Sequence, residues 1–138
     1  MSLKHTILLL AAKDDPETAG VSHALSAQGV KDTVYWIQTD EYPDRHTALT
    51  LEAQGIRYGN RVLKSVHTAY LRSVCCNPLT PMFNDALQAE PYATLAALSE
   101  KRGALMGLLR ILQAQGARLI NTLEANMQHT AKPWQLHL

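Results

Sequence analysis

Two isolated cations in this chain have the chemistry to hold an anionic ligand. Arg72 ends a strand-like segment, and Lys132 stands beside a proline where a helix-like segment begins. A guanidinium is planar and permanently charged, and it suits a carboxylate or a phosphate, so Arg72 is a candidate for binding a substrate anion. An internal ion pair for Arg72 and solvation at the surface for Lys132 are equally compatible with the sequence.

A pair of carboxylates, Asp14 and Asp15, directly follows the apolar run from Thr6 to Ala12. The pair resembles the acidic residues with which receiver domains hold magnesium. On that interpretation the chain is a stand-alone α/β module that binds a partner or a ligand without phosphotransfer. The competing interpretation is a helix N-cap at Asp15, followed by Pro16 in the first turn, with Asp14 in solvent.

Other site chemistries find little support. The segment after the first apolar run contains no glycine before Gly20, which argues against a dinucleotide-binding or P-loop enzyme. No two of the six histidines lie three to five residues apart, so the spacing predicts no metal site. No nucleophile-elbow sequence supports a hydrolase, and the sequence assigns no catalytic residue.

Length and charge narrow the class of protein further. The chain has 138 residues, and 13 lysines and arginines against 12 acidic residues give a net charge of +1. This predicts one ordinary domain without the basic surface that nucleic-acid binding requires. The longest apolar run, Ile7 to Ala12, is too short to cross a membrane, which predicts a cytoplasmic protein. Cys75 and Cys76 are expected to be reduced residues that serve in packing.

The first third of the chain predicts a strand, a helix and a second strand. The run from Thr6 to Ala12 has the length and composition of a strand buried on both faces. A helix is expected to begin after Asp15 and to end at Gly29, where a left-handed conformation is easy. Thr33 to Gln38 supplies the second strand, and the unit predicts parallel pairing.

The rest of the chain predicts an antiparallel section and then helices. Glycine turns separate short segments at Ala48–Leu51, Ile56–Leu63 and Val66–Val74, which favours an antiparallel hairpin or meander. A helical section with a leucine stripe follows over Met82–Ala114, in which Gly103 and Gly107 are expected to permit close helix packing. Beyond it we expect a last strand, Ala117–Ile120, and a capping box formed by Asn121 and Glu124.

Several segments together resemble one family. ARLINTLEANMQHTAKPWQLHL, at 117–138, has a strand that ends in Asn121 and, after a helix, Lys132 at the start of another. TDEYPDRHTALTL carries an acidic-aromatic-proline turn, VHTAYLRSV ends near Arg72, and LSEKRGALMGLLRIL places Glu100 before a leucine stripe. In these features the chain is similar to the N-terminal part of ATP-grasp ligases, in the branch of ribosomal-protein glutamate ligases and peptide-crosslinking ligases. Many relatives have two arginines and a proline after the strand, where this sequence has a single arginine.

The resemblance implies a fold and a division of the chain. It implies a Rossmann-like pre-ATP-grasp α/β domain over residues 1–121, with a mainly parallel sheet flanked by helices and an antiparallel hairpin or meander. Residues 122–138 would be connecting helices that lead toward an ATP-grasp domain. By the same resemblance Lys132 contacts ATP, while Arg72 and Asp14 lie on the substrate side.

The implied function is that of a substrate-side domain in a larger ATP-dependent carboxylate-amine or carboxylate-hydroxyl ligase. The full-length enzyme would use ATP and magnesium and act on a peptide, a protein or an amino acid. The partners of this domain would be the remaining ATP-grasp domains of the same chain, with a homodimer contact as a further expectation. The 138 residues alone are expected to be catalytically silent, without a bound cofactor, nucleic acid or membrane.

Overall fold

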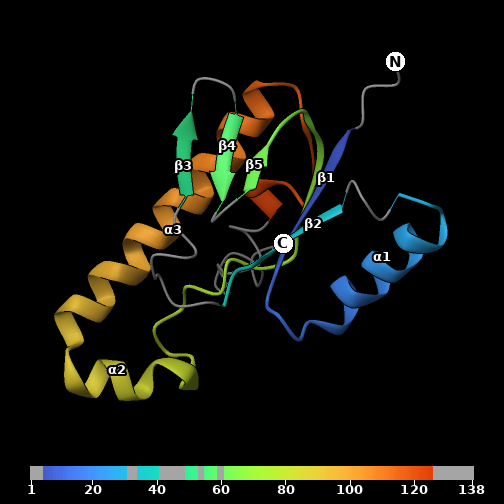
Figure 1. Ribbon diagram of the computed structural model, residues 1–138. Coiled ribbons are helices and arrows are strands. Elements are labelled where there is room, and N and C mark those ends of the chain that lie inside the picture. Colours follow the sequence, from blue (N-terminus) through green and yellow to red (C-terminus); the bar gives the residue numbers. More distant parts are fainter. Residues whose placement is uncertain (1–4, 31–33, 41–48, 53–54, 59–60, 126–138) are drawn as a thin grey trace, which may run out of the picture.

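The fold combines a parallel sheet with a small antiparallel one (Figure 1). The computed structural model describes residues 5–30, 34–40, 49–52, 55–58 and 61–125. The four-stranded parallel sheet has the order β2-β1-β6-β7, from β1 (Thr6–Ala11), β2 (Val34–Gln38), β6 (Val66–Leu71) and β7 (Arg118–Ile120). The three-stranded sheet has the order β3-β4-β5, from β3 (Leu49–Glu52), β4 (Gly55–Tyr58) and β5 (Arg61–Leu63). This confirms the predicted α/β class with a parallel sheet and an antiparallel segment.

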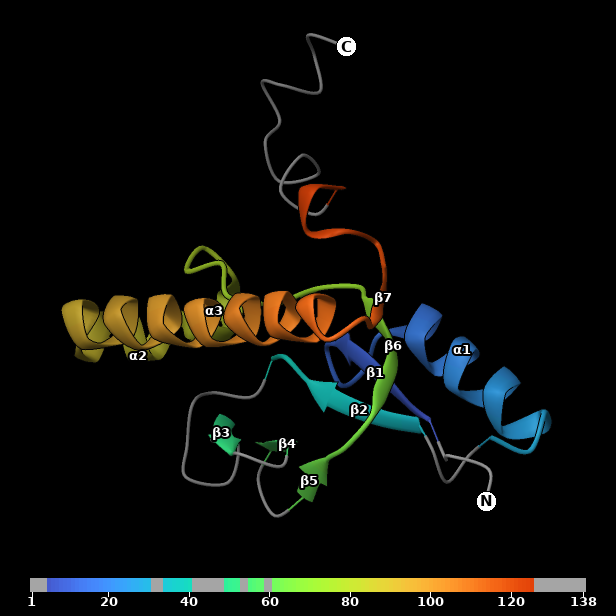
Figure 2. The ribbon, with the colours of Figure 1, turned by 90° about the horizontal axis from the view of Figure 1, so that it is seen from above.

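Strand β1 lies inside the sheet and carries the centre of the core. Leu8, Leu9, Leu10 and Ala11 are all fully buried. Leu8 and Leu10 belong to the main core cluster, and since successive side chains of a strand alternate between faces, Leu9 points to the other face. Figure 2 shows helices α1 and α3 on opposite sides of the sheet, which explains why a strand without polar alternation is stable here.

Helix α1 (Pro16–Ala27) follows β1 as predicted. Asp15 is its N-cap and accepts a hydrogen bond from the N–H of Thr18, with Pro16 in the first turn. Gly29 follows the helix with a φ of +78°, a left-handed conformation that glycine adopts easily. The helix leads to β2, which pairs with β1 in parallel.

The prediction that Val66–Val74 belongs to an antiparallel meander was wrong. Strands β3, β4 and β5 do form one, but β6 leaves it and pairs with β1 in parallel. The reason is burial: Ala69 and Leu71 are fully buried, while Val66 and Tyr70 on the alternate positions are half-buried. The small sheet therefore lies in the connection between β2 and β6, where a doubly wound fold would have a helix.

The predicted helical section is divided into three parts. They are a 3-10 turn, η2 (Pro81–Phe83), and two helices, α2 (Asn84–Ala89) and α3 (Pro91–Ala114). The division falls at Glu90, whose backbone is non-helical (ψ 75°) because the proline that follows disfavours the α conformation. In α3 the stripe of leucines that faces the core consists of Leu98, Leu105, Leu108, Leu109 and Leu112. No helix in the part of the chain that the structure describes has the length and apolarity to span a membrane.

The end of the described chain shows a different cap from the predicted one. Asn121 has a left-handed backbone (φ +60°), and its side-chain amide donates to the carbonyl of Leu71, 3.0 Å away. The hydroxyl of Thr122 accepts the N–H of Ala125 instead, so the cap lies one residue later than the expected capping box. Leu123 packs into the core, and the domain boundary at 121/122 stays a prediction.

The expectation that Gly103 and Gly107 permit close helix packing was also wrong, because no other element among the described residues comes within 4 Å of a Cβ built on either glycine. Replacing Gly103 by alanine should raise the free energy of unfolding by about 0.5 to 1 kcal/mol, since glycine costs helix interiors backbone entropy. Urea denaturation measures this change.

Gly55→Ala is the control, because it should change the free energy of unfolding in the opposite direction. Gly55 has a φ of +152°, and an added Cβ would lie 2.7 Å from the carbonyl oxygen of Leu63. This variant should be less stable than the wild type. A loss of stability in Gly103→Ala would contradict the open environment of that residue.

Candidate functional site

A cleft of about 700 Å³ opens where β1, β2 and β6 end. Ligands of open α/β sheets bind at this edge, outside the carboxyl ends of parallel strands. Its walls come from the segments that follow the three strands and from one residue of α3. The lining residues are Ala12, Asp15, Asp40, Arg72, Ser73, Val74, Cys75, Cys76, Asn77, Pro78, Thr80, Met82 and Arg102.

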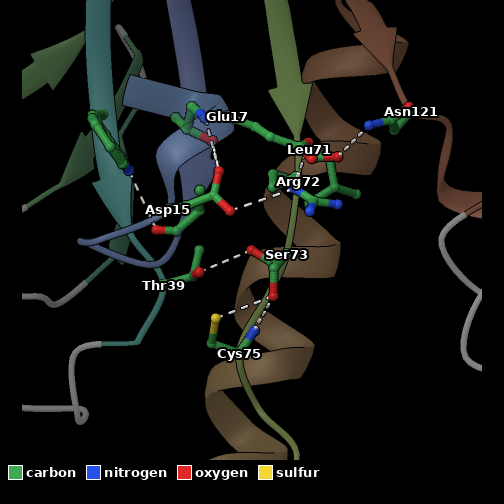
Figure 3. A network of polar contacts seen from close by, with 11 residues as sticks. Asp15, Glu17, Thr39, Leu71, Arg72, Ser73, Cys75 and Asn121 are labelled. Atoms are coloured by element: carbon green, nitrogen blue, oxygen red, sulfur yellow. Dashed lines mark hydrogen bonds and ion pairs between the residues drawn. The ribbon is translucent and has the colours of Figure 1, made fainter. Parts of the chain in front are cut away.

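Thr39, immediately after β2, joins the segments that lead into the cleft. It is fully buried, its N–H donates to the carbonyl of Ala11 at 2.9 Å, and its hydroxyl donates to the carbonyl of Ser73 at 2.8 Å (Figure 3). The carbonyl of Thr39 accepts a hydrogen bond from the ammonium group of Lys101 on α3. The ends of three strands and helix α3 are thus fixed to one another through a single residue.

Arg72 stands at the end of β6, between the sheet and α1. Its N–H continues the β ladder by donating to the carbonyl of Leu10 at 2.9 Å. Its guanidinium Nε lies 3.1 Å from a carboxylate oxygen of Glu17 and 3.5 Å from one of Asp15 (Figure 3). The side chain is 40% exposed, so the ion pairs orient Arg72 and leave part of its surface accessible to a ligand.

Asp15 is the acidic partner that also caps α1. One carboxylate oxygen accepts both the hydroxyl of Thr18 at 2.6 Å and the N–H of Thr18 at 2.8 Å. The Thr18 hydroxyl bond lowers the pKa of Asp15 most, burial opposes it, and the Thr18 N–H and Arg72 lower that pKa further. Asp15 is therefore ionised in the folded protein over a wider range of acid pH than a free aspartate.

Asp15→Ala should cost about 1 kcal/mol of stability at neutral pH, the usual value of an N-cap. Because the folded pKa of Asp15 is lowered, this contribution is present above the unfolded pKa and is lost as pH falls through the folded one. The difference between variant and wild type should shrink below about pH 4. Urea denaturation at a series of pH values measures it.

Asp14→Ala is the matched control, because Asp14 is exposed and no hydrogen bond or ion pair joins it to the described part of the chain. We expect a change within about 0.5 kcal/mol. Equal effects at both positions would contradict the capping role of Asp15.

The segment after Arg72 has an unusual backbone. Cys75 adopts a left-handed conformation (φ +46°), which is uncommon for a residue other than glycine. Its N–H donates to the hydroxyl oxygen of Ser73 at 3.1 Å, and its thiol lies 3.1 Å from the same oxygen. This local turn places the thiol of Cys75 on the wall of the cleft, beside Val74 and Cys76.

The two thiols are both free, and only Cys76 is buried. Burial raises the pKa of the Cys76 thiol, an effect that the charges of Lys101 and Arg102 partly offset. Cys76 donates to the carbonyl of Val74 at 2.9 Å and serves in packing as expected. Cys75 is half-buried and belongs to the cleft instead.

Arg102 is a charged residue of the lining that the sequence analysis did not single out. It reaches the cleft from α3, is exposed, and forms no hydrogen bond or ion pair within the ranges that the structure describes. The other charges are engaged: Asp40 accepts the N–H of Lys13 at 2.8 Å, and Arg72 pairs with Asp15. Arg102 is therefore the cation of this cleft that has most hydrogen-bonding capacity to offer a ligand.

The structure brings together some of the predicted site residues and leaves others apart. Arg72 lines the cleft, whereas Asp14 is exposed and does not line it. Lys132 falls outside the described residues. In the described ranges no three His, Cys, Asp or Glu side chains are grouped to hold a metal ion.

Comparison with solved structures finds ATP-grasp ligases. The structure of the ATP-grasp ligase PsnB complexed with minimal precursor, Mg and ADP matches 95% of this chain with a TM-score of 0.72 and 26% identity. PsnB complexed with a phosphomimetic variant of minimal precursor, Mg and ADP matches 99% with a TM-score of 0.78 and 25% identity. The macrocyclase MdnB from Microcystis aeruginosa MRC matches 87% with a TM-score of 0.57 and 21% identity, which shows a shared fold.

The chain spans 41% and 44% of the two PsnB chains and 38% of the MdnB chain. No protein-family model matches the sequence, and neither does any curated protein. The predicted resemblance to ATP-grasp ligases of the peptide-modifying type is confirmed, and it extends over nearly all of this chain.

Proposed function

We propose that this chain is the N-terminal, substrate-side part of a larger ATP-dependent ligase that joins a carboxylate of a peptide to an amine or hydroxyl group. The observation that carries the proposal is the likeness to PsnB over 95 to 99% of this chain at 25 to 26% identity. The PsnB structures contain a precursor peptide, and this favours a peptide over a free amino acid as substrate.

The cleft at the ends of β1, β2 and β6 is where we place the contribution of this chain to substrate binding. Arg72, held by Asp15 and Glu17, would steer a substrate carboxylate toward the cleft, and Arg102 would bind it from helix α3. Met82 and Pro78 add apolar surface for neighbouring parts of a peptide. Asp14, which lies outside the lining, contributes at most to the rim.

In this proposal ATP and magnesium bind away from the cleft, mainly to other parts of the full-length enzyme. Magnesium prefers several oxygen ligands, and the cleft offers Asp15 and Asp40, each already accepting hydrogen bonds. We therefore assign no cofactor to the cleft, and Lys132 stays the candidate contact to the nucleotide. The 138 residues should then catalyse nothing by themselves.

Receiver-like binding without phosphotransfer is the less favoured candidate. Its basis was the pair Asp14 and Asp15, but Asp15 caps α1 through Thr18 and pairs with Arg72. The carboxylate of Asp15 is therefore already engaged in capping the helix and in an ion pair. No specific observation favours magnesium binding there.

The test starts with the reading frame downstream of Leu138 and continues with the encoded full-length protein. Incubated with ATP, magnesium and a precursor peptide encoded nearby, it should lower the mass of the peptide by one water for each bond formed. The 138-residue chain in the same assay should leave the peptide unchanged. A stop codon directly after Leu138, with no ATP-grasp domain encoded beyond it, would overturn the proposal.

A further inference from the structure

Two histidines lie side by side at the edge of the parallel sheet opposite the cleft. His5 precedes β1 and His67 lies in β6, and their ring centroids are 5.1 Å apart with an interplanar angle of 54°. Both side chains are exposed. The pair lies at the beginning of parallel strands whose other ends form the cleft, so its role is independent of the proposed function.

A bulge in the strand pairing places His67 at this position. Thr6 pairs with Val66, but the next residue, Ile7, pairs with Thr68, which leaves His67 as the extra residue of β6. Bulges change the direction of a side chain and are rare in parallel pairs. The turn just before β6 is also unusual, since Ser65 has a left-handed backbone (φ +51°) while its carbonyl accepts the N–H of Thr6 at 3.1 Å.

The spacing of the rings is compatible with two ligands on one metal ion. With metal–nitrogen bonds of about 2.0 to 2.1 Å and tetrahedral angles, two imidazole centroids come to lie about 5.2 Å apart. The observed 5.1 Å is close to this value, so the two rings are near enough to share one ion once a nitrogen of each turns toward it.

Thr68 supplies a contact of the kind that supports a metal-binding histidine. Its hydroxyl oxygen lies 2.9 Å from Nδ1 of His67. In the tautomer in which Nδ1 donates to that oxygen, Nε2 carries the free lone pair that a metal requires. Metal-binding histidines usually have such a partner on the second ring nitrogen.

We propose that His5 and His67 bind one zinc ion, or a divalent metal of similar preference, with water completing the coordination. Imidazole nitrogens suit this class of ion, whereas magnesium and calcium prefer oxygen. In the part of the chain that is described, no third His, Cys, Asp or Glu joins the pair. The site therefore keeps open coordination positions.

The test is a zinc titration of the full chain, followed by calorimetry and by the imidazole resonances in NMR spectra. We expect saturable binding of one ion, with His5 and His67 resonances shifted and those of His23, which is exposed on α1, unchanged. His5→Gln and His67→Gln should each weaken binding at least about tenfold, and Thr68→Val about tenfold through its effect on His67. His23→Gln is the matched control and should bind as the wild type does.

Two results would overturn the proposal. One is the absence of saturable zinc binding by the wild type. The other is binding that shifts the resonances of other histidines or that survives both His5→Gln and His67→Gln. Because the resonances are read in the wild type, a variant that fails to fold does not remove the test.

Discussion

Replacing Leu109 by alanine is expected to lower the free energy of unfolding by about 3 kcal/mol, within the range of 2 to 5 kcal/mol typical of buried leucines. Leu109 is fully buried on α3, in the same core cluster as Leu8 and Leu10 of β1 and Leu71 of β6. Truncation removes buried apolar surface and leaves a cavity between the helix and two central strands. Urea denaturation followed by circular dichroism measures the loss.

Leu95→Ala is the matched control, since Leu95 lies on the same helix but is 44% exposed. The substitution is chemically the same but removes little buried surface. We expect it to lower the free energy of unfolding by less than about 1 kcal/mol. Equal losses in the two variants would mean that α3 does not pack on the sheet through the leucine stripe. A small loss in both would have the same meaning.

Local patterns predicted the elements of this fold better than their pairing. The apolar run of β1, the Asp15 cap and the turn at Gly29 are all local signals, and each was found where expected. The position of β6 is not a local property. Val66–Leu71 could pair with β5 across a short turn or with β1 across a long separation, and the burial of Ala69 and Leu71 against the core decides for β1.

The candidate site was predictable only in part, for the same reason. Arg72 stood out because a cation at the end of an apolar strand needs a partner, and the structure supplies Glu17 and Asp15. Arg102 looked like an ordinary surface residue of a helix, because its place on the cleft depends on how α3 crosses the sheet. His5 and His67 are 62 positions apart in the sequence, beyond any search based on ligand spacing.

The two arginines of the cleft differ in the hydrogen bonds and ion pairs that they form within the chain. This difference decides which of them is the better position at which to test substrate binding by mutation. Arg72 pairs with Glu17 and Asp15, so its loss would disturb α1 as well as any ligand. Arg102 has no hydrogen bond or ion pair in the described ranges, and its removal should leave the fold intact. Effects at Arg102 can therefore be attributed to binding.

Arg102→Gln in the full-length ligase is expected to lower kcat/KM for an acidic precursor peptide about tenfold to a hundredfold. This range corresponds to the loss of a hydrogen bond to a charged group, worth about 1.5 to 3 kcal/mol. The KM for ATP should stay unchanged, because the proposal places the nucleotide away from this cleft. Replacing the acidic side chains of the peptide by amides should remove most of the difference between variant and wild type.

Arg110→Gln provides the comparison, because Arg110 is an exposed arginine of the same helix that does not line the cleft. The substitution changes the net charge by the same amount, so a general electrostatic effect on an acidic peptide would appear in both variants. We expect the large loss only for Arg102→Gln. If the two variants lose activity equally, or if neither loses any, Arg102 does not bind the peptide and the substrate side of this chain lies elsewhere than the cleft at the ends of β1, β2 and β6.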